Sequence, residues 1–568
     1  MLKVTFYMIV KIAINKQCIV KALMKIGKAT VFWAIAFSLQ PQNLVVAQPP
    51  INIEDASTST RVKKIRVQGY TIFSDQEIAK IIKPYQGKKL DFRQLRKITE
   101  AITNLYVSKG YITSGAFLPN QEIVEGIINI RVVEGKLEDL NIKGLKHLQE
   151  NYVRSFISSA QKLSKPNTES QSISLSDQSP PLNIKNIESE LDLLKRDPSI
   201  KNIEAELVKG TEPNLSILLI EVEETSPYDA KLSFDNYRSP SVGEFQGTIE
   251  AGYRNFLGVS DRAFAQYNLT EGLDAYSVGY GTPIVSPKNG TLSFEYRNGD
   301  SKIIENFEEA NIRAESDTVS LQYRRPIIYK PEREIALGLA FERQNSETFI
   351  LDDQPFSFTA DPQQTNSVIS VLKLTGDWIE RSPTSVLGVN SELNFGLDVF
   401  DATVNDNTPD GLFFSWLGQG QWTKALNQDR NLLFVTRLTT QLSPDSLLPL
   451  EQFTLGGVGT VRGYRQNQEV GDNAVVGTIE VYLPLIGDRI SSSKLNLVPF
   501  FDGGTVWDNN SNEAEALTSL GLGLDWQFKE FLSLRVDWGI PLINTSDRGD
   551  SLQDNGFAFS LQLQPFKF

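Results

Sequence analysis

The stretch LGLGLDWQFKEFLSLRVDWGI, residues 520–540, alternates apolar and polar side chains in two segments separated by Lys529 and Glu530. Alternation with period two places every second side chain on one face of a β-sheet. One face is then apolar and aromatic, while the other is small, polar and charged; residues 387–399 show the same contrast. A soluble sandwich also alternates but rarely needs so many long strands. The pattern is typical of a transmembrane barrel, whose apolar face meets lipid and whose polar face lines a wet lumen.

Composition narrows the ways in which this chain of 568 residues can cross a membrane. Charged residues make up 22% of it, and after the first 47 residues no run approaches the roughly 18 apolar residues that a membrane helix needs. Only helices and closed barrels satisfy every backbone polar group in lipid. A membrane-spanning chain of this composition must therefore be a closed barrel.

The first 47 residues differ from the rest. Lys25 and Lys28 precede the apolar stretch 31–39, and Val45-Val46-Ala47 offers small residues for cleavage. We expect residues 1–47 to be a signal peptide, with Met24 as the possible true start. The only cysteine, Cys18, lies in this segment, so the mature chain would contain neither a disulfide nor a thiolate metal site.

The charge balance excludes a nucleic-acid partner. The chain has 56 lysines and arginines, and losing the six lysines of residues 1–47 leaves 50 against 69 acidic residues, a net charge of −19. Such an acidic chain is a poor nucleic-acid binder. Export without thiols is typical of an envelope protein of a two-membrane bacterium.

Residues 61–135 predict an α+β module that follows the short polar lead 48–60. Ser74 with Glu77 forms a capping box for a helix through Ile82, and Asp91 caps a second helix that ends at Gly110. The module reads strand, helix, helix, strand, strand, with these strands: 62–67, 112–118 and 127–133.

Residues 136–225 repeat that order and predict a second module. We expect residues 164–181, rich in Ser, Pro and Gln, to be a disordered surface insertion. The single histidine, His147, is expected on the surface, because one imidazole makes neither a metal site nor a triad. The predicted elements are the strands 137–142, 203–208 and 215–222 and the helices 150–163 and 184–195.

Residues 226–568 predict the barrel itself. Sixteen strand-like segments start at Tyr228, and short turns alternate with longer acidic loops along the chain. Short turns on one rim and long loops on the other are typical of an outer-membrane barrel. An even strand number places both barrel ends on the short-turn, periplasmic side, next to the two modules.

One long-rim loop carries the tetrad Val461-Arg462-Gly463-Tyr464, and the strand after next carries Phe500, Asp502 and Gly504 as Phe-x-Asp-x-Gly. Together these motifs resemble those of the two-partner secretion transporters, the haemolysin secretion and activation proteins. That family lies within the outer-membrane assembly superfamily of POTRA domains followed by a barrel. The resemblance covers essentially the whole mature chain and implies two POTRA domains and a sixteen-stranded barrel.

The resemblance also implies a site. In the family the loop folds back into the barrel and its arginine contacts the aspartate of the lumen wall, which are Arg462 and Asp502 here. Gly463 would permit close approach of the loop tip, and Tyr464 and Phe500 would pack beside the pair. An exposed pair contributes about 0–1 kcal/mol, whereas breaking an enclosed one costs about 3–5 kcal/mol. The alternative is a solvated loop arginine and an aspartate that hydrates the pore wall.

A second expected site is the edge strand of the first module. Ile112, Ser114, Ala116 and Leu118 lie on the strand that we expect to pair with an extended substrate chain. The alternative is that the modules are rigid spacers. Family members often begin with a plug helix, but the thirteen residues 48–60 reach at most about 45 Å. A plug with its linker does not fit, so we expect the loop 443–473 to be the main obstruction.

These features predict an outer-membrane translocator that captures an unfolded partner in the periplasm and exports it without ATP. The sequence contains no Gly-x4-Gly-Lys-Ser/Thr loop, and the glycines of residues 456–463 do not follow a βαβ unit, so we expect no nucleotide site. With no cysteine in the mature chain and one histidine, we expect neither an enzyme nor a cofactor or metal site. The expected partners are a large secreted protein, outer-membrane lipid and the barrel-assembly machinery that inserts the chain. The alternatives are an insertase of the same superfamily and a passive porin.

Overall fold

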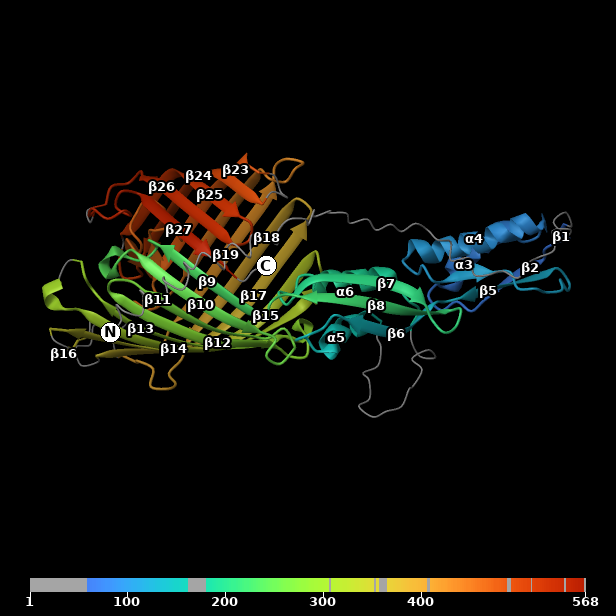
Figure 1. Ribbon diagram of the computed structural model, residues 1–568, viewed down its shortest axis with the longest axis horizontal. Helices are drawn as coiled ribbons and strands as arrows, with labels where there is room; N and C mark the ends of the chain where they lie inside the picture. Colours follow the sequence, from blue (N-terminus) through green and yellow to red (C-terminus); the bar gives the residue numbers. More distant parts are fainter. Residues whose placement is uncertain are drawn as a thin grey trace, which may run out of the picture. The chain divides into compact units, whose positions relative to one another are not determined.

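The computed structural model describes most of the chain after residue 58 (Figure 1). The expected signal peptide, most of the polar lead and nearly all of the expected insertion lie outside the described residues. The described ranges are 59–161, 180–305, 308–351, 354–356, 365–405, 409–487, 492–511, 513–545 and 548–565. Of the helices in these ranges, none has the length and apolar character needed to cross a membrane.

The first module is a three-stranded sheet covered by two helices. The capping boxes predicted at Ser74 and Asp91 are both present and begin α3 and α4. The central strand β5 pairs in parallel with β2 and antiparallel with β4. The bounds are β1 Thr60–Arg61, β2 Lys64–Gln68, α3 Asp75–Ile82, η2 Lys83–Tyr85, β3 Lys89–Leu90, α4 Phe92–Ser108, β4 Gly115–Phe117 and β5 Ile127–Val133.

The predicted strand 112–118 is wrong in its first half. The backbone N–H of Ser114 donates to the carbonyl of Tyr111 at 3.1 Å, which closes a turn. The Ser114 hydroxyl accepts a hydrogen bond from the N–H of Gly135 at 3.0 Å, so its side chain points into the module. Only Gly115–Phe117 remains as the edge strand β4.

The second module repeats the first. Its central strand β8 pairs in parallel with β6 and antiparallel with β7, and two helices bury an apolar core that includes Tyr152, Phe156 and Leu194. The bounds are β6 Lys136–Lys143, α5 Glu150–Gln161, α6 Ile184–Leu194, β7 Ile200–Lys209 and β8 Leu215–Glu224.

Sixteen long strands of residues 228–563 form the closed antiparallel barrel that the sequence predicted (Figure 1). Pairing of β27 with β9, from Ser560↔Asp235 to Leu563↔Leu232, closes the ring. A two-residue strand, β16 Gln354–Pro355, pairs antiparallel with the end of β15. The long strands are β9 Tyr228–Asp235, β10 Gln246–Arg254, β11 Arg262–Leu269, β12 Leu273–Pro283, β13 Thr291–Lys302, β14 Arg313–Tyr329, β15 Arg333–Ile350, β17 Asn366–Ser382, β18 Ser385–Gly396, β19 Phe414–Ala425, β20 Leu433–Leu442, β23 Asn473–Ile486, β24 Ser493–Trp507, β25 Ala514–Phe528, β26 Leu532–Pro541 and β27 Phe557–Leu563.

Burial in the barrel is inverted relative to a soluble protein. Leu520, Leu522 and Leu524 are 45%, 48% and 46% exposed, whereas Asp502 and Ser519 are fully buried. Leucine is normally inside and aspartate outside. The inversion fits an apolar outer surface in lipid around a polar interior.

The two rims also differ as the sequence predicted. The long-loop rim carries the connections 397–413, 443–472 and 542–556, while the opposite rim has turns such as 383–384 and 529–531. One exception is the turn 270–272 between β11 and β12, which is short although it belongs to the long-loop rim. The connection 443–472 carries the candidate site.

Candidate functional site: a loop fastened inside the barrel

The connection between β20 and β23, residues 443–472, is called the inward loop here. It forms a hairpin from β21 Phe453–Leu455 and β22 Glu469–Gly471, and its tip carries residues 456–466. Leu455, Val461 and Tyr464 are at most 4% exposed. They pack on wall residues of β23, β24 and β25: Ala474, Val476, Val506 and Leu517. The loop therefore lies against the inner face of the barrel.

Glycines allow the tip to lie this close to the wall. Gly463 has a φ of 92°, a conformation that favours glycine. A Cβ on Gly463 would lie 2.9 Å from the carbonyl carbon of Gly539 in β26. A Cβ on Gly504 would lie 2.8 Å from Cδ1 of Leu455, so this wall glycine leaves room for the loop's own core residue.

Arg462 is enclosed and binds Asp502 through three hydrogen bonds. Its Nε donates to Oδ2 at 2.7 Å, its Nη2 donates to Oδ1 at 2.8 Å, and its backbone N–H donates to Oδ2 at 3.1 Å. Arg462 is 5% exposed and Asp502 is 0% exposed. This is the bidentate geometry in which a guanidinium binds a carboxylate most strongly. The structure thus brings the predicted pair together in the enclosed form.

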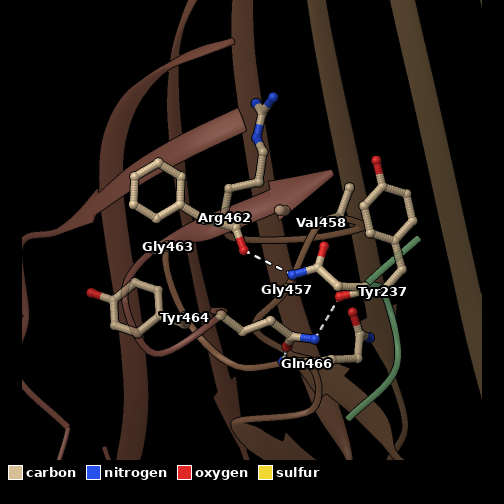
Figure 2. Close-up of a pocket in the computed structure, with 12 residues that line it drawn as sticks. Tyr237, Gly457, Val458, Arg462, Gly463, Tyr464 and Gln466 are labelled. Atoms are coloured by element: carbon tan, nitrogen blue, oxygen red, sulfur yellow. Dashed lines mark hydrogen bonds between the residues drawn. The ribbon is translucent and has the colours of Figure 1, made fainter. Parts of the chain in front are cut away.

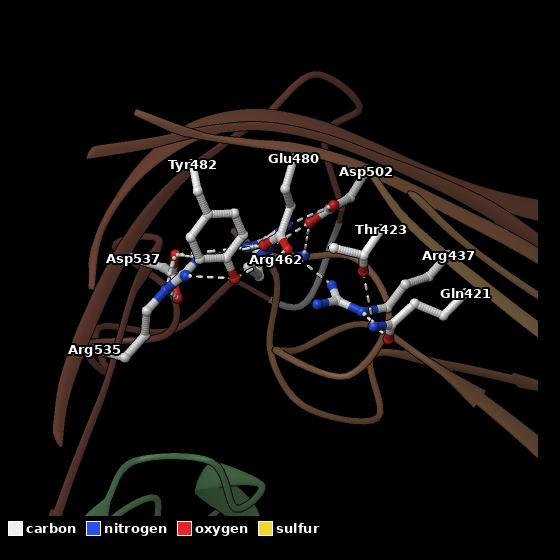
Figure 3. A network of polar contacts seen from close by, with 9 residues as sticks. All are labelled: Gln421, Thr423, Arg437, Arg462, Glu480, Tyr482, Asp502, Arg535 and Asp537. Atoms are coloured by element: carbon white, nitrogen blue, oxygen red, sulfur yellow. Dashed lines mark hydrogen bonds and ion pairs between the residues drawn. The ribbon is translucent and has the colours of Figure 1, made fainter. Parts of the chain in front are cut away.

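Two further carboxylates surround the same guanidinium (Figure 3). Nη1 of Arg462 donates to Oε1 of Glu480 at 2.6 Å and lies 3.5 Å from Oδ1 of Asp537. Arg535 bridges Asp537 and Glu480, and Arg437 binds the other oxygen of Glu480 at 3.0 Å. We call these residues the lumen cluster: Arg437, Arg462, Glu480, Asp502, Arg535 and Asp537. Its three arginines balance its three carboxylates.

Aromatic side chains frame the lumen cluster. Cζ of Arg462 lies 3.5 Å from the centre of the Phe500 ring, which is a cation–π contact. Gly521 leaves space for that ring, because a Cβ there would lie 2.4 Å from Cζ of Phe500. Arg462 and Tyr464 point away from each other on either side of Gly463 (Figure 2).

Tyr464 fastens the tip at a second point on the wall. Its hydroxyl donates to the carbonyl of Thr518 at 2.8 Å or to that of Ile543 at 3.0 Å. The same oxygen accepts the N–H of Ile543 at 3.1 Å. All the anchor residues predicted from the sequence therefore lie at this one place.

Sequence reasoning missed Glu480, Asp537, Arg437 and Arg535. Each shares the parity of the polar face of its strand, which was a usable signal. Their meeting depends on register, such as the pairing of Glu480 with Phe500 across β23 and β24. A shift of one residue would turn the entire face outward.

The base of the inward loop holds a carboxyl group in an unusual environment. Burial, with smaller contributions from Glu342 and Glu392, raises the pKa of Glu451 to about 7 against the opposing effect of Lys373. Next to it, Leu447 and Leu448 pack with Ile369, Val371 and Phe413 in a separate apolar cluster. Glu451 is therefore a titratable group at the point where the loop leaves the wall.

The four predicted residues of the edge strand do not share one open face. Ile112 is 43% exposed in the turn, whereas Ser114 is 3% exposed. Ala116 and Leu118 pack against the module core. Within the described residues no group of His, Cys, Asp and Glu is placed to hold a metal ion.

The barrel, the modules and the internally fastened loop define a class: outer-membrane barrels with periplasmic POTRA domains. Residues 214–526 match the family model described as haemolysin secretion/activation protein ShlB/FhaC/HecB, and residues 60–135 match the ShlB-type POTRA domain. The first match covers more than half of the chain. The chain belongs to the haemolysin secretion/activation protein family and is an outer-membrane translocator.

Curated relatives agree over most of the chain. The outer membrane transporter CdiB of Dickeya dadantii (strain 3937) is 22% identical over 89% of this chain and 87% of its own length. The heme/hemopexin transporter protein HuxB of Haemophilus influenzae (strain 86-028NP) is 21% identical over 84% and 82%. These relatives are transporters, so the alternative of an insertase is not favoured.

Solved structures share the fold. CdiB from Escherichia coli superposes with a TM-score of 0.67 at 20% identity, covering 92% of this chain and 93% of that one. BamA from Haemophilus ducreyi lacking POTRA domains 1–3 gives a TM-score of 0.51 at 14% identity, covering 89% and 100%.

Proposed function

We propose that this protein captures an unfolded secreted partner at its POTRA modules and exports it through the barrel lumen without nucleotide. In this proposal the inward loop obstructs the lumen at rest and leaves the wall during export. The observation that carries the proposal is the lumen cluster, in which three carboxylates hold the buried guanidinium of Arg462. Removing one partner of a buried ion pair costs about 3–5 kcal/mol, enough to hold a loop of this length.

Several features support export over catalysis. The curated relatives are named as transporters, including the hemolysin transporter protein HpmB of Proteus mirabilis, which supports export over catalysis. Their names give different cargoes or none, so we propose only the class of cargo, a large secreted protein. We propose no enzymatic activity and no resident cofactor. Outer-membrane lipid surrounds the barrel in this proposal, and the cellular barrel-assembly machinery inserts it.

The first experiment compares the proteins secreted by cells with and without this chain. Loss of one large secreted protein supports export. A general loss of outer-membrane barrels would support an insertase instead. The same strain carrying Arg462→Ala should keep a heat-modifiable folded barrel yet lose export, whereas normal export would contradict the anchor role. Arg430→Gln is the matched control, because that exposed arginine lies in a short turn of the opposite rim.

For capture we propose the short edge strand β4 together with the exposed Ile112. An extended chain that pairs with β4 gains backbone hydrogen bonds with little demand on sequence. A photocrosslinker at Phe117 should capture the secreted partner, whereas one at Gln68 on the opposite edge strand β2 should not. Equal yields from both positions would favour the spacer alternative.

A further inference from the structure

We propose that Arg465 is a positioning residue that closes the long-loop rim by joining two rim loops from separate parts of the barrel wall. This inference goes beyond the proposed function, because it concerns closure of the mouth and does not depend on the identity of the cargo. Arg465 lies three residues after Arg462 on the inward loop. Its ion pairs are with Glu305 and Asp554, which are not members of the lumen cluster.

The guanidinium of Arg465 binds two carboxylates at once. Nε and Nη2 donate to Oδ1 and Oδ2 of Asp554 at 2.5 and 2.8 Å. Nη1 and Nη2 donate to Oε2 and Oε1 of Glu305 at 2.9 and 2.7 Å. The side chains of Arg465 and Asp554 are 15% and 2% exposed, so this contact is shielded from water, whereas the Glu305 side chain is 30% exposed. Two planar, bidentate contacts use the fork that distinguishes arginine from lysine.

The two carboxylates come from distant parts of the wall. Asp554 lies in the loop between β26 and β27, and Glu305 lies in the loop between β13 and β14. In ring order β9, β10, β11 and β12 stand between these strand pairs. Five inter-strand spacings correspond to about 24 Å along the wall. The two loops therefore meet at the guanidinium of Arg465.

Backbone contacts continue the bridge over the intervening strands. The N–H of Ile304 donates to the carbonyl of Ser241 at 2.9 Å, and the N–H of Gly272 donates to that of Val242 at 3.0 Å. Gly272, in the short turn 270–272, also accepts the N–H of Lys302 at 2.7 Å and so links the two connections. We call the residues 236–245, 303–305 and 548–556 the outer lid.

Further hydrogen bonds orient Asp554 and stabilise its charged form. The N–H and hydroxyl of Ser551 donate to Oδ2 at 3.0 and 2.7 Å, and Nε of Arg548 donates to the carbonyl of Asp554 at 2.9 Å. Burial opposes its charged form, but the hydrogen bonds from Arg465 and Ser551 outweigh burial and lower the pKa of Asp554 to about 2. Asp554 therefore stays ionised over the range in which cells grow.

The inward loop and the outer lid are joined beside the bridge as well. The backbone N–H of Gln466 donates to Oε1 of Gln553 at 2.8 Å. Nε2 of Gln553 donates to the carbonyls of Asn236 and Arg238, at 2.6 and 2.5 Å. The loop thus has an inner fastening on the wall and an outer one at the mouth, and moving the loop must release both.

The test is single-channel recording of the purified full-length protein in planar bilayers. Arg465→Gln should raise the open fraction about tenfold, the factor that corresponds to about 1.4 kcal/mol. Arg465→Lys should give an intermediate value, because one ammonium cannot hold two carboxylates in a fixed plane. Arg430→Gln is the control and should behave as the native protein. An open fraction for Arg465→Gln equal to that of this control would overturn the proposal.

A folding defect is separated from lid opening by a second variant. Heat-modifiability in gels reports folding of each preparation. If Arg465→Gln does not fold, Glu305→Gln decides, because it removes the contact to β13–β14 and leaves the Asp554 contact in place. A raised open fraction in Glu305→Gln then supports the lid, and an unchanged one overturns it. Export assays are not involved, so failure here is distinct from failure of the proposed function.

Discussion

Replacing Arg462 with alanine tests the buried anchor most directly. The change removes three charge-assisted hydrogen bonds to Asp502 and Glu480, and the backbone N–H bond to Asp502 depends on the same docked position. Breaking a buried pair while leaving its partner charged costs about 3–5 kcal/mol. The population of the undocked loop should then rise roughly 140- to 3,700-fold, at 1.4 kcal/mol per factor of ten.

Thiol labelling measures that population. Val461 is 0% exposed beside Arg462, and the one native cysteine lies in the segment expected to be cleaved. A Val461→Cys reporter is protected while the loop is docked and reacts when it opens, so the labelling rate follows the open population. Cysteine behaves as a small apolar residue and suits a buried site.

The labelling rate of the Val461→Cys reporter is compared in three variants with that in the native protein. Arg462→Ala should speed labelling by the factor above, Arg462→Lys should lie between, and Arg430→Gln should match the native protein. Adding Asp502→Asn to Arg462→Ala should change the rate by less than the sum of the single effects, because both remove one interaction. A change of less than about threefold in Arg462→Ala would refute the enclosed pair, since an exposed pair contributes only about 0–1 kcal/mol.

Three further predictions use the same reporter. Gly463→Ala should release the loop, because it combines a φ of 92° with a Cβ 2.9 Å from the Gly539 backbone; Gly388→Ala, where no atom lies within 4 Å of the Cβ, should not. Tyr464→Phe should speed labelling about 5- to 150-fold by orphaning buried backbone groups worth about 1–3 kcal/mol; native protection would contradict this. Burial raises the pKa of Glu451 to about 7, so docking of the inward loop should weaken as pH rises from about 4.5 to 7 and should not change further above pH 7. Glu451→Gln should abolish this pH dependence of docking. A pH profile unchanged by Glu451→Gln would contradict the buried position of this carboxyl group.

Local patterns made much of the barrel predictable. Alternation in residues 520–540 marks two strands because the outer face must be apolar and the inner face must not. The capping boxes at Ser74 and Asp91 were equally readable, since a cap depends on residues only three positions apart. The strand 112–118 was misjudged because the Ser114 hydroxyl binds Gly135, a contact across 21 positions that no local pattern contains.

Only part of the candidate site could be predicted from the sequence, for a related reason. Arg462 and Asp502 stood out as members of short motifs, whereas Glu480 and Asp537 resemble any polar residue of an inner face. The bridge from Arg465 to Glu305 spans 160 positions and depends on the path of two loops. Register and loop path arise from the closed ring as a whole, so these partners could not be named in advance.

The lumen cluster has three arginines, including Arg462, and three carboxylates, and this balance has a consequence for the barrel after the inward loop has left its interior. Without Arg462, the lumen cluster would hold three carboxylates and two arginines, which amounts to one surplus negative charge. A lysine or arginine of an exported chain would be attracted to these carboxylates and would bind them transiently. In the proposed function, this surplus charge would favour the return of Arg462 to its binding site after the exported chain has passed.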